Sequence, residues 1–95
     1  MSVYMIIDIQ VQNSALYAEY VEKVPAILSQ YGGRYLVRGG AITPLSGNWN
    51  PERIVVIEFE TIERLRACFS SAEYRAIGLL REQSTTSKSI VVEGV

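Results

Sequence analysis

The stretch YGGRYLVRGG, residues 31–40, places two glycine pairs around a five-residue run that has an arginine at each end. Gly32 follows the last apolar position of a helical pattern, where a left-handed residue closes a helix most easily. Residues 34–38 then alternate as a strand does, with Arg34, Leu36 and Arg38 on one side. The pair Gly39–Gly40 predicts a bulge, a positive φ or a close approach by another group. The segment therefore joins a helix to a strand.

The residues before this stretch predict a strand followed by a helix. Residues 3–11 alternate with a period of two and are rich in β-branched side chains, as in a strand. Asn13 is a residue type that caps helices, and apolar side chains then recur at helical spacing from Tyr17 to Tyr31. Pro25 removes one backbone donor from this helix.

The residues after the stretch predict two more strands and a helical region in two pieces. Residues 41–45 resume an extended pattern, 46–52 are rich in turn residues, and 53–60 form a strand. Thr61 starts a helix through about Phe69, and Ser70 with Glu73 fits a capping box for a second helical piece. Residues 83–88 read as a polar loop and 89–94 as the last strand.

The order of these elements is β-α-β-β-α-β, which predicts a ferredoxin-like α+β fold over one domain, residues 1–95. The sheet is expected to be antiparallel with the helices on one face. Right-handed crossovers make the first and third strands the central neighbours.

Composition excludes several classes of function. The net charge is −1, so a nucleic-acid surface is not expected. The chain has no histidine and one cysteine, which removes histidine-based catalysis, nearly all zinc or iron sites and an internal disulfide. Residues 3–11 are apolar but short, have no basic flank or cleavage-type end, and are interrupted by Asp8, so neither a signal peptide nor a membrane span is expected there. We expect a cytoplasmic protein that uses no metal and no organic cofactor and binds no membrane.

The strand patterns predict one sheet face under the helices and one open face. Tyr35 and Val37 are assigned to the helix side. The open face is expected to carry apolar side chains together with charged ones: Tyr4, Ile6, Leu36, Ile54, Val56 and Val91, with Asp8, Arg34, Arg38, Glu58 and Glu93. Six large apolar residues exceed what a monomer usually exposes, so a homodimer with facing sheets is predicted.

Four segments of the chain resemble a known family. YGGRYLVRGG, GNWNPERIVVIEF, SAEY and the terminal VVEGV are similar to the bacterial domain-of-unknown-function family numbered 1330, over nearly the whole chain. The resemblance implies the dimeric α/β-barrel superfamily and therefore the fold and the dimer. It implies little about activity, because the superfamily includes cofactor-free monooxygenases, lactone isomerases, haem enzymes and ligand-sensing domains.

Three charged residues on the predicted open face are the catalytic candidates. Arg38 suits a bidentate grip on a carboxylate or enolate, or else an internal ion pair with Asp8 or Glu58. Asp8 and Glu58 are at matching parity on the central strands, so one of them is a candidate general base with a raised pKa. The alternative is structural pairing with Arg34, Arg38 or Arg53.

The ligand-binding candidates are aromatic, glycine and arginine residues around the predicted helices and loop: Tyr17, Tyr20, Tyr31, Arg38, Gly39, Gly40, Trp49, Arg53 and Tyr74. The tyrosines either line an aromatic pocket or pack as core. Trp49 is either a lid or an anchor for its loop. Cys68 is expected in the core, and Arg81 near a helix C-terminus, with an anion contact as its alternative.

These features predict a small-molecule-binding protein. If the protein is an enzyme, we expect it to act without a cofactor on a phenolic, carbonyl or carboxylate compound, with Asp8 or Glu58 as the base and Arg38 as the anion stabiliser. The alternative is a ligand-binding or dimer-interaction module without catalysis.

Overall fold

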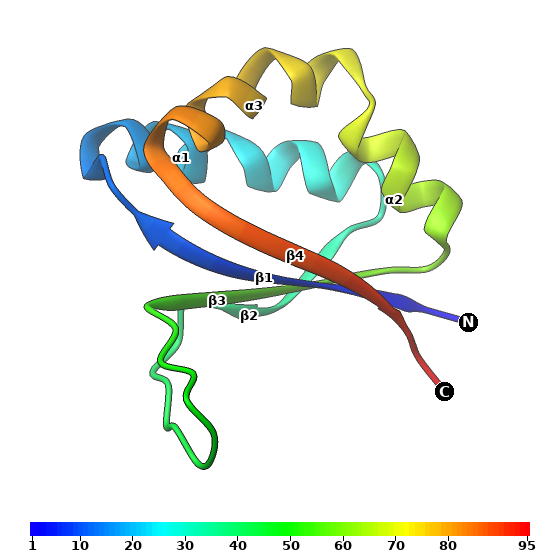
Figure 1. Ribbon diagram of the computed structural model, residues 1–95. Helices are drawn as coiled ribbons and strands as arrows, with labels where there is room; N and C mark the ends of the chain where they lie inside the picture. The colour runs from blue at the N-terminus through cyan, green and yellow to red at the C-terminus, as the bar shows by residue number, and fades with distance from the viewer.

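The computed structural model describes residues 1–95 as a four-stranded antiparallel sheet with three helices packed on one of its faces (Figure 1). In chain order the elements are β1 (Val3–Val11), α1 (Ser14–Gln30), β2 (Arg34–Arg38), β3 (Arg53–Phe59), α2 (Ile62–Phe69), α3 (Ala72–Ser84) and β4 (Thr85–Glu93). The strand order is β2-β3-β1-β4, so β1 and β3 are the central neighbours, as expected. The predicted ferredoxin-like α+β fold is confirmed.

The core lies between the sheet and the helices, and it follows from two periodicities. Odd-numbered residues of β1 and β3 are buried under the helices, while the inner face of α1 contributes side chains at helical spacing. The buried apolar residues form one cluster: Val3, Met5, Ile7, Ile9, Tyr17, Tyr20, Val24, Leu28, Val55, Ile57, Phe59, Leu65, Cys68, Tyr74 and Ile77. Cys68 is therefore a core residue, as predicted.

Local hydrogen bonds explain why the helices begin where they do. The side chain of Asn13 accepts from the amide of Leu16, and Thr61 accepts from the amide of Arg64. The predicted cap of α3 is one residue too early. Ser71 accepts from the amide of Tyr74, whereas the Ser70 hydroxyl donates back to the Arg66 carbonyl at the end of α2.

Two connecting segments differ from the sequence prediction. Residues 41–45 form no strand, and the whole segment from 39 to 52 extends from the side of the sheet opposite the helices (Figure 1). The polar loop predicted over residues 83–88 does not exist, because α3 ends at Ser84 and β4 begins at Thr85. The buried carbonyl of Ser84 accepts from the amides of Gln12 and Asn13, which fixes this abrupt junction.

The strand register corrects part of the face assignment. β2 pairs with β3 with a shift between Tyr35 and Val37, so Val37 lies opposite Val56 and Arg38 opposite Val55. Val37 is therefore on the open face and Arg38 on the helix face, the reverse of the prediction. In β4, Val91 pairs with Met5 on the helix side, and Ile90 and Val92 occupy the open face instead.

Candidate functional site

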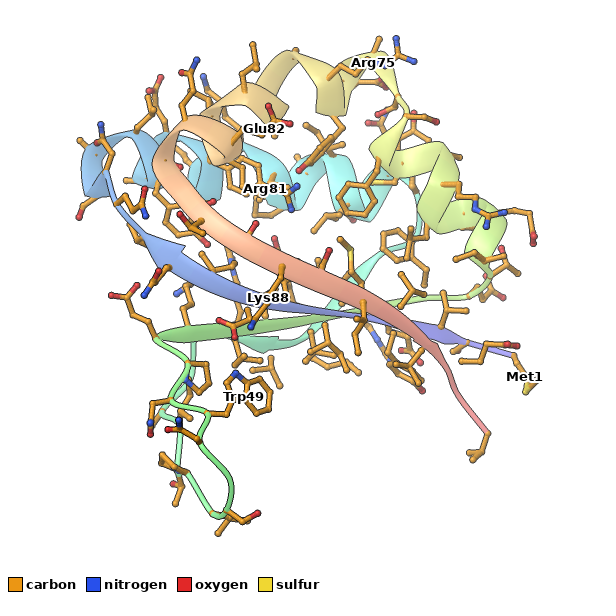
Figure 2. The ribbon with its side chains drawn as sticks, in the orientation of Figure 1. Met1, Trp49, Arg75, Arg81, Glu82 and Lys88 are labelled. Carbon is orange, nitrogen blue, oxygen red and sulfur yellow. The ribbon has the colours of Figure 1, made fainter.

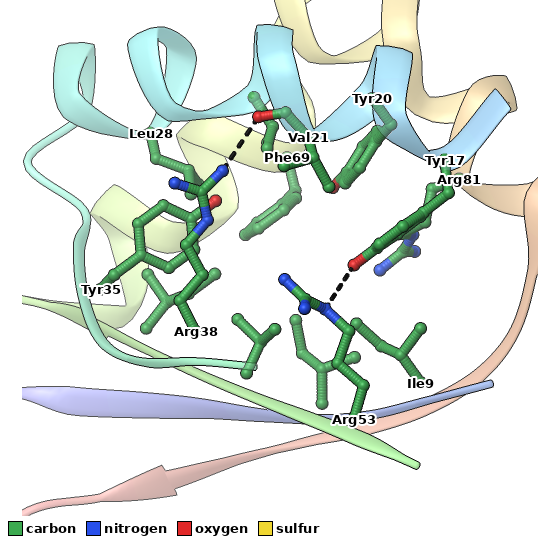
Figure 3. A pocket seen from close by; sticks show the side chains of 14 residues that line it. Ile9, Tyr17, Tyr20, Val21, Leu28, Tyr35, Arg38, Arg53, Phe69 and Arg81 are labelled. Atoms are coloured by element: carbon green, nitrogen blue, oxygen red, sulfur yellow. Dashed lines mark hydrogen bonds between the residues drawn. The ribbon is translucent and has the colours of Figure 1, made fainter. Parts of the chain in front are cut away.

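A small cavity lies between the sheet and helices α1 and α3 (Figure 3). Its volume is about 20 Å³, which is room for a single water molecule. Most of its lining is apolar, and the polar exceptions are tyrosine hydroxyls and arginine side chains. The lining residues are Ile7, Ile9, Tyr17, Tyr20, Val21, Val24, Leu28, Tyr35, Arg38, Arg53, Val55, Ile57, Phe69 and Arg81.

Arg38 reaches this cavity because of the bulge in β2. Its Nη2 donates a hydrogen bond of 2.9 Å to the Val21 carbonyl of α1, and its guanidinium carbon lies 4.6 Å from the ring centre of Tyr35. The side chain is exposed. The ion pair with Asp8 or Glu58, one of the two roles predicted for Arg38, does not form within the protomer, because both carboxylates lie on the other face of the sheet.

Arg53 enters the cavity from the start of β3. Its Nε donates to the Tyr17 hydroxyl at 3.0 Å, and its guanidinium carbon lies 5.5 Å from the centre of that ring. Gly39 makes room for this arrangement. Gly39 has a φ of +70°, and a Cβ there would collide with the Arg53 guanidinium. The close approach predicted for the second glycine pair is therefore confirmed at Gly39, while Gly40 faces open space.

The hydroxyls of Tyr20 and Tyr35, which both line the cavity, stay protonated at neutral pH. The Tyr20 and Tyr74 hydroxyls are 3.0 Å apart, and burial together with the neighbouring Tyr74 raises the pKa of Tyr20. Burial also raises the pKa of Tyr35, with the Arg38 guanidinium opposing part of that rise. Neither phenol is therefore available as a base near pH 7, although both can donate a hydrogen bond.

The charge of the cavity is one-sided. Arg81 of α3 lies between its helix and the sheet, whereas Arg75 of the same helix is on the outer side (Figure 2). With Arg38 and Arg53, it brings three guanidinium groups to the cavity, and no aspartate or glutamate is among the lining residues. An arrangement of this kind attracts an anion.

The predicted carboxylates occupy separate places on the open face. Asp8 accepts a 2.9 Å hydrogen bond from the indole nitrogen of Trp49, which anchors the 39–52 segment to the sheet. Glu58 pairs with Arg34. This hydrogen bond from Arg34 holds the pKa of Glu58 below its usual value, so the raised pKa expected of a general base is not found there.

The remaining candidates lie outside the cavity lining. The Tyr31 hydroxyl donates to Glu73 on α3, and Tyr74 meets the cavity only through Tyr20. Burial raises the pKa of the Cys68 thiol to about 11, with the nearby Glu73 adding to the effect, which agrees with a core role. No three histidine, cysteine, aspartate or glutamate side chains gather as a metal site requires.

Several of the lining residues were not among the ligand-binding candidates, including two aromatic ones. Tyr35 was assigned to the helix side but to no site, and Phe69 was treated as the end of a helix. Arg81 had been given an anion contact as its second reading. Tyr35 and Arg38 lie close together on one short strand, which could have indicated a shared site. A regular alternation of side chains places them on opposite faces of the sheet, however, so their common position at the cavity was not predicted.

Comparisons with known proteins agree on the fold. A protein of unknown function from Rhodopseudomonas palustris superposes with a TM-score of 0.82 at 14% identity, covering 99% of this chain and 82% of that one. SnoaB, a cofactor-independent oxygenase from Streptomyces nogalater, gives 0.70 at 12% identity, with 99% and 93% covered. A dimeric protein of unknown function with a ferredoxin-like fold from Bacteroides fragilis gives 0.65 at 13%, with 98% and 96% covered.

Sequence comparison gives the family. No curated protein is significantly similar to the chain. The model of one family, described as a domain of unknown function, DUF1330, matches residues 2–95. The resemblance seen in the glycine-rich segment is thereby confirmed, and the chain belongs to the DUF1330 family.

Proposed function

We propose that the protein binds a small organic anion in the arginine-lined cavity. One observation carries the proposal: three guanidinium groups, from Arg38, Arg53 and Arg81, converge on an apolar cavity whose lining contains no carboxylate. The ligand's charged group would lie among these side chains and its apolar part against the tyrosine rings. A carboxylate, phenolate or enolate has the required chemistry.

The size of the cavity says how such a ligand would be accommodated. The enclosed space of about 20 Å³ holds no organic molecule. Arg53 and Arg81 are half-buried, so these long side chains can move outward. A bound anion would replace the Tyr17 hydroxyl as the partner of Arg53, and Arg38 would meet it with the N–H donors that its bond to the Val21 carbonyl leaves free.

Binding of benzoate, compared with neutral benzyl alcohol, tests the proposal. Titrations followed by NMR should show benzoate binding more tightly, with shifts at Tyr17 and Tyr35. Replacing Arg38 or Arg53 with methionine should weaken benzoate binding about tenfold or more, because one hydrogen bond to a charged group is lost. Arg75→Met is the matched control and should leave binding unchanged, since Arg75 is exposed on the outer side of α3 (Figure 2). Equal affinity for the two compounds would refute the proposal.

An enzymatic role is the second candidate, and the same charge pattern favours it. A cofactor-free enzyme for a phenolic or carbonyl compound must stabilise the substrate anion, and a cavity with guanidinium groups and no base does so while the proton passes to solvent. 4-Nitrophenol absorbs differently in its two ionisation states. Its apparent pKa should fall on binding, and fall less in Arg38→Met. An unchanged pKa would leave a binding module without this chemistry.

We also propose that two protomers pair through their open sheet faces. Apolar side chains remain exposed there, among them Ile90 and Val92, and one relative with this fold is described as dimeric.

Each helix falls short of the length and apolar character needed to cross a bilayer. The buried free thiol of Cys68 and the net charge of −1 support a cytoplasmic protein that does not bind nucleic acid.

A further inference from the structure

Helix α1 contains a proline that removes one backbone hydrogen bond from the helix beside the cavity. In an α-helix the carbonyl of residue 21 accepts from the amide of residue 25. Residue 25 is Pro25, inside α1, and proline has no amide hydrogen to donate. The Val21 carbonyl therefore lacks its normal helical partner, and a buried or partly buried carbonyl without a partner is costly.

Arg38 supplies the missing donor. Its Nη2 lies 2.9 Å from the Val21 oxygen, and Figure 3 shows the guanidinium spanning from the sheet to α1 at the edge of the cavity. We propose that Pro25 is a positioning residue: by leaving the Val21 carbonyl free, it fixes the guanidinium of Arg38 in place for the ligand anion. This inference rests on the proposed function, since it concerns the same cavity.

The arrangement uses little of the binding capacity of Arg38. A guanidinium has five N–H donors, and the bond to Val21 occupies one of them. The ring of Tyr35 beneath the guanidinium restricts it further. An exposed arginine otherwise samples many rotamers, and ordering it on binding weakens affinity. Holding it beforehand lets the remaining donors meet an anion without that loss.

The variant Pro25→Ala tests the proposal because it changes the backbone donor and little else. Alanine restores the amide and has the highest helix propensity, so the Val21 carbonyl returns to the helix and Arg38 is released. We expect the Tm to rise while benzoate affinity falls about three- to tenfold, the range expected for ordering one long side chain. A general loss of structure would lower both, so the opposite signs separate positioning from unfolding.

Arg38→Met provides the control by a double-mutant cycle. In that background Pro25→Ala should cause no further loss of benzoate affinity, because the proline acts through the arginine. An equal loss in both backgrounds would overturn the proposal, as would a Pro25→Ala protein that binds like the wild type or melts at a lower temperature.

NMR of the Arg38 guanidinium tests the positioning without a ligand. Hydrogen bonding slows rotation of the group, so its N–H signals should be resolved in the wild type and averaged in Pro25→Ala. If the wild type fails to bind benzoate while these signals behave as expected, the proposed function fails and the positioning by Pro25 stands. Unchanged signals in Pro25→Ala refute the positioning.

Discussion

Gly39 shows how a single residue without a side chain determines where a charged group lies. It combines a positive φ with a backbone that touches the Arg53 guanidinium, so any Cβ there is both strained and in the way. Gly47 has the same backbone state, with a φ of +78°, but a Cβ there would meet nothing within 4 Å. The two glycines therefore separate conformational strain from steric displacement.

Gly39→Ala should lower stability and weaken benzoate binding, whereas Gly47→Ala should lower stability alone. Both variants place an L-residue at positive φ, which should lower the free energy of unfolding by about 1–3 kcal/mol. Only the first pushes Arg53 away from Tyr17. Urea unfolding and the benzoate titration measure the two effects, and equal affinities for the two variants would show that Arg53 moves freely around a Cβ.

Glu58 gives a pH dependence whose sign follows from its partner. Arg34 lowers the pKa of this carboxyl in the folded state, so ionisation favours the fold. The stabilisation is complete above the unfolded pKa of about 4.3 and is lost as pH falls through the lower folded value. The Tm difference between wild type and Glu58→Gln should therefore shrink on acidification. The Tm difference between wild type and Arg34→Met should shrink on acidification in the same way. A Tm difference that grows towards low pH would contradict the lowered pKa of Glu58.

At the scale of the elements, the junction between α2 and α3 depends on two adjacent serines with different tasks. Ser71 accepts from the amide of Tyr74 and also donates to the Cys68 carbonyl, at 3.1 and 2.6 Å. Ser70 lies one residue earlier, is exposed, and bonds back into α2. Only Ser70 has a glutamate three residues later, Glu73, so the sequence pattern favours Ser70, whereas the path of the chain makes Ser71 the cap.

Ser71→Ala should lower the unfolding free energy by about 1 kcal/mol, the usual effect of losing an N-cap. Ser70→Ala should change it by a smaller amount, because the α3 amide keeps its acceptor. Urea unfolding of the two variants makes the comparison. The opposite ranking would mean that α3 is capped from Ser70, as the sequence pattern had indicated.

Elements with a strong period were predictable and their irregularities were not. β1 matches the expected residues 3–11, and α1 and β3 fall close to their predicted bounds, because burial on one face imposes a period on the sequence. The bulge between Tyr35 and Val37 carries no glycine or proline signal. It is set by pairing with β3 and by the contact of Arg38 with α1, both of which are tertiary.

The candidate site depended on that irregularity. Tyr17 and Tyr20 follow the helical spacing of α1 and line the cavity. Arg53 also lines it, although the sequence named it both as a ligand-binding candidate and as a possible partner of Asp8 or Glu58. Arg38 was recognised as a candidate anion group but assigned to the wrong face, which also paired it with the wrong carboxylates. The face assigned to each residue of a strand depends on regular alternation along the residues before it. One unrecognised bulge therefore placed Arg38, the central residue of the site, on the wrong face of the sheet.

At the scale of the whole molecule, the two surfaces offer a matched test of assembly. Ile90 of β4 and Leu79 of α3 are each 60% exposed, the first on the open sheet face and the second on the outside of the helices. Neither contributes much to the core of the protomer. Comparing substitutions at these two positions therefore shows which of the two faces a second protomer covers.

Ile90→Lys should convert the protein to a monomer, and Leu79→Lys should leave it a dimer. A lysine on the open face buries a charge between the two sheets, where it has no partner. Light scattering at micromolar concentration reports the mass, and circular dichroism checks that both variants stay folded. A monomeric wild type would remove the premise, and a dimeric Ile90→Lys would place the interface elsewhere.

The bulge in β2 also bears on how the chain tolerates insertions and deletions. β2 pairs with one neighbour, β3, so a residue added there disturbs a single ladder. Without Leu36, Arg34, Tyr35, Val37 and Arg38 would alternate regularly and keep the faces they have now. A lineage can therefore gain or lose one residue at this position while the arginine remains aimed at the cavity. Alignments of distant members should accordingly place a one-residue gap between the tyrosine and the arginine, and not within β1 or β3.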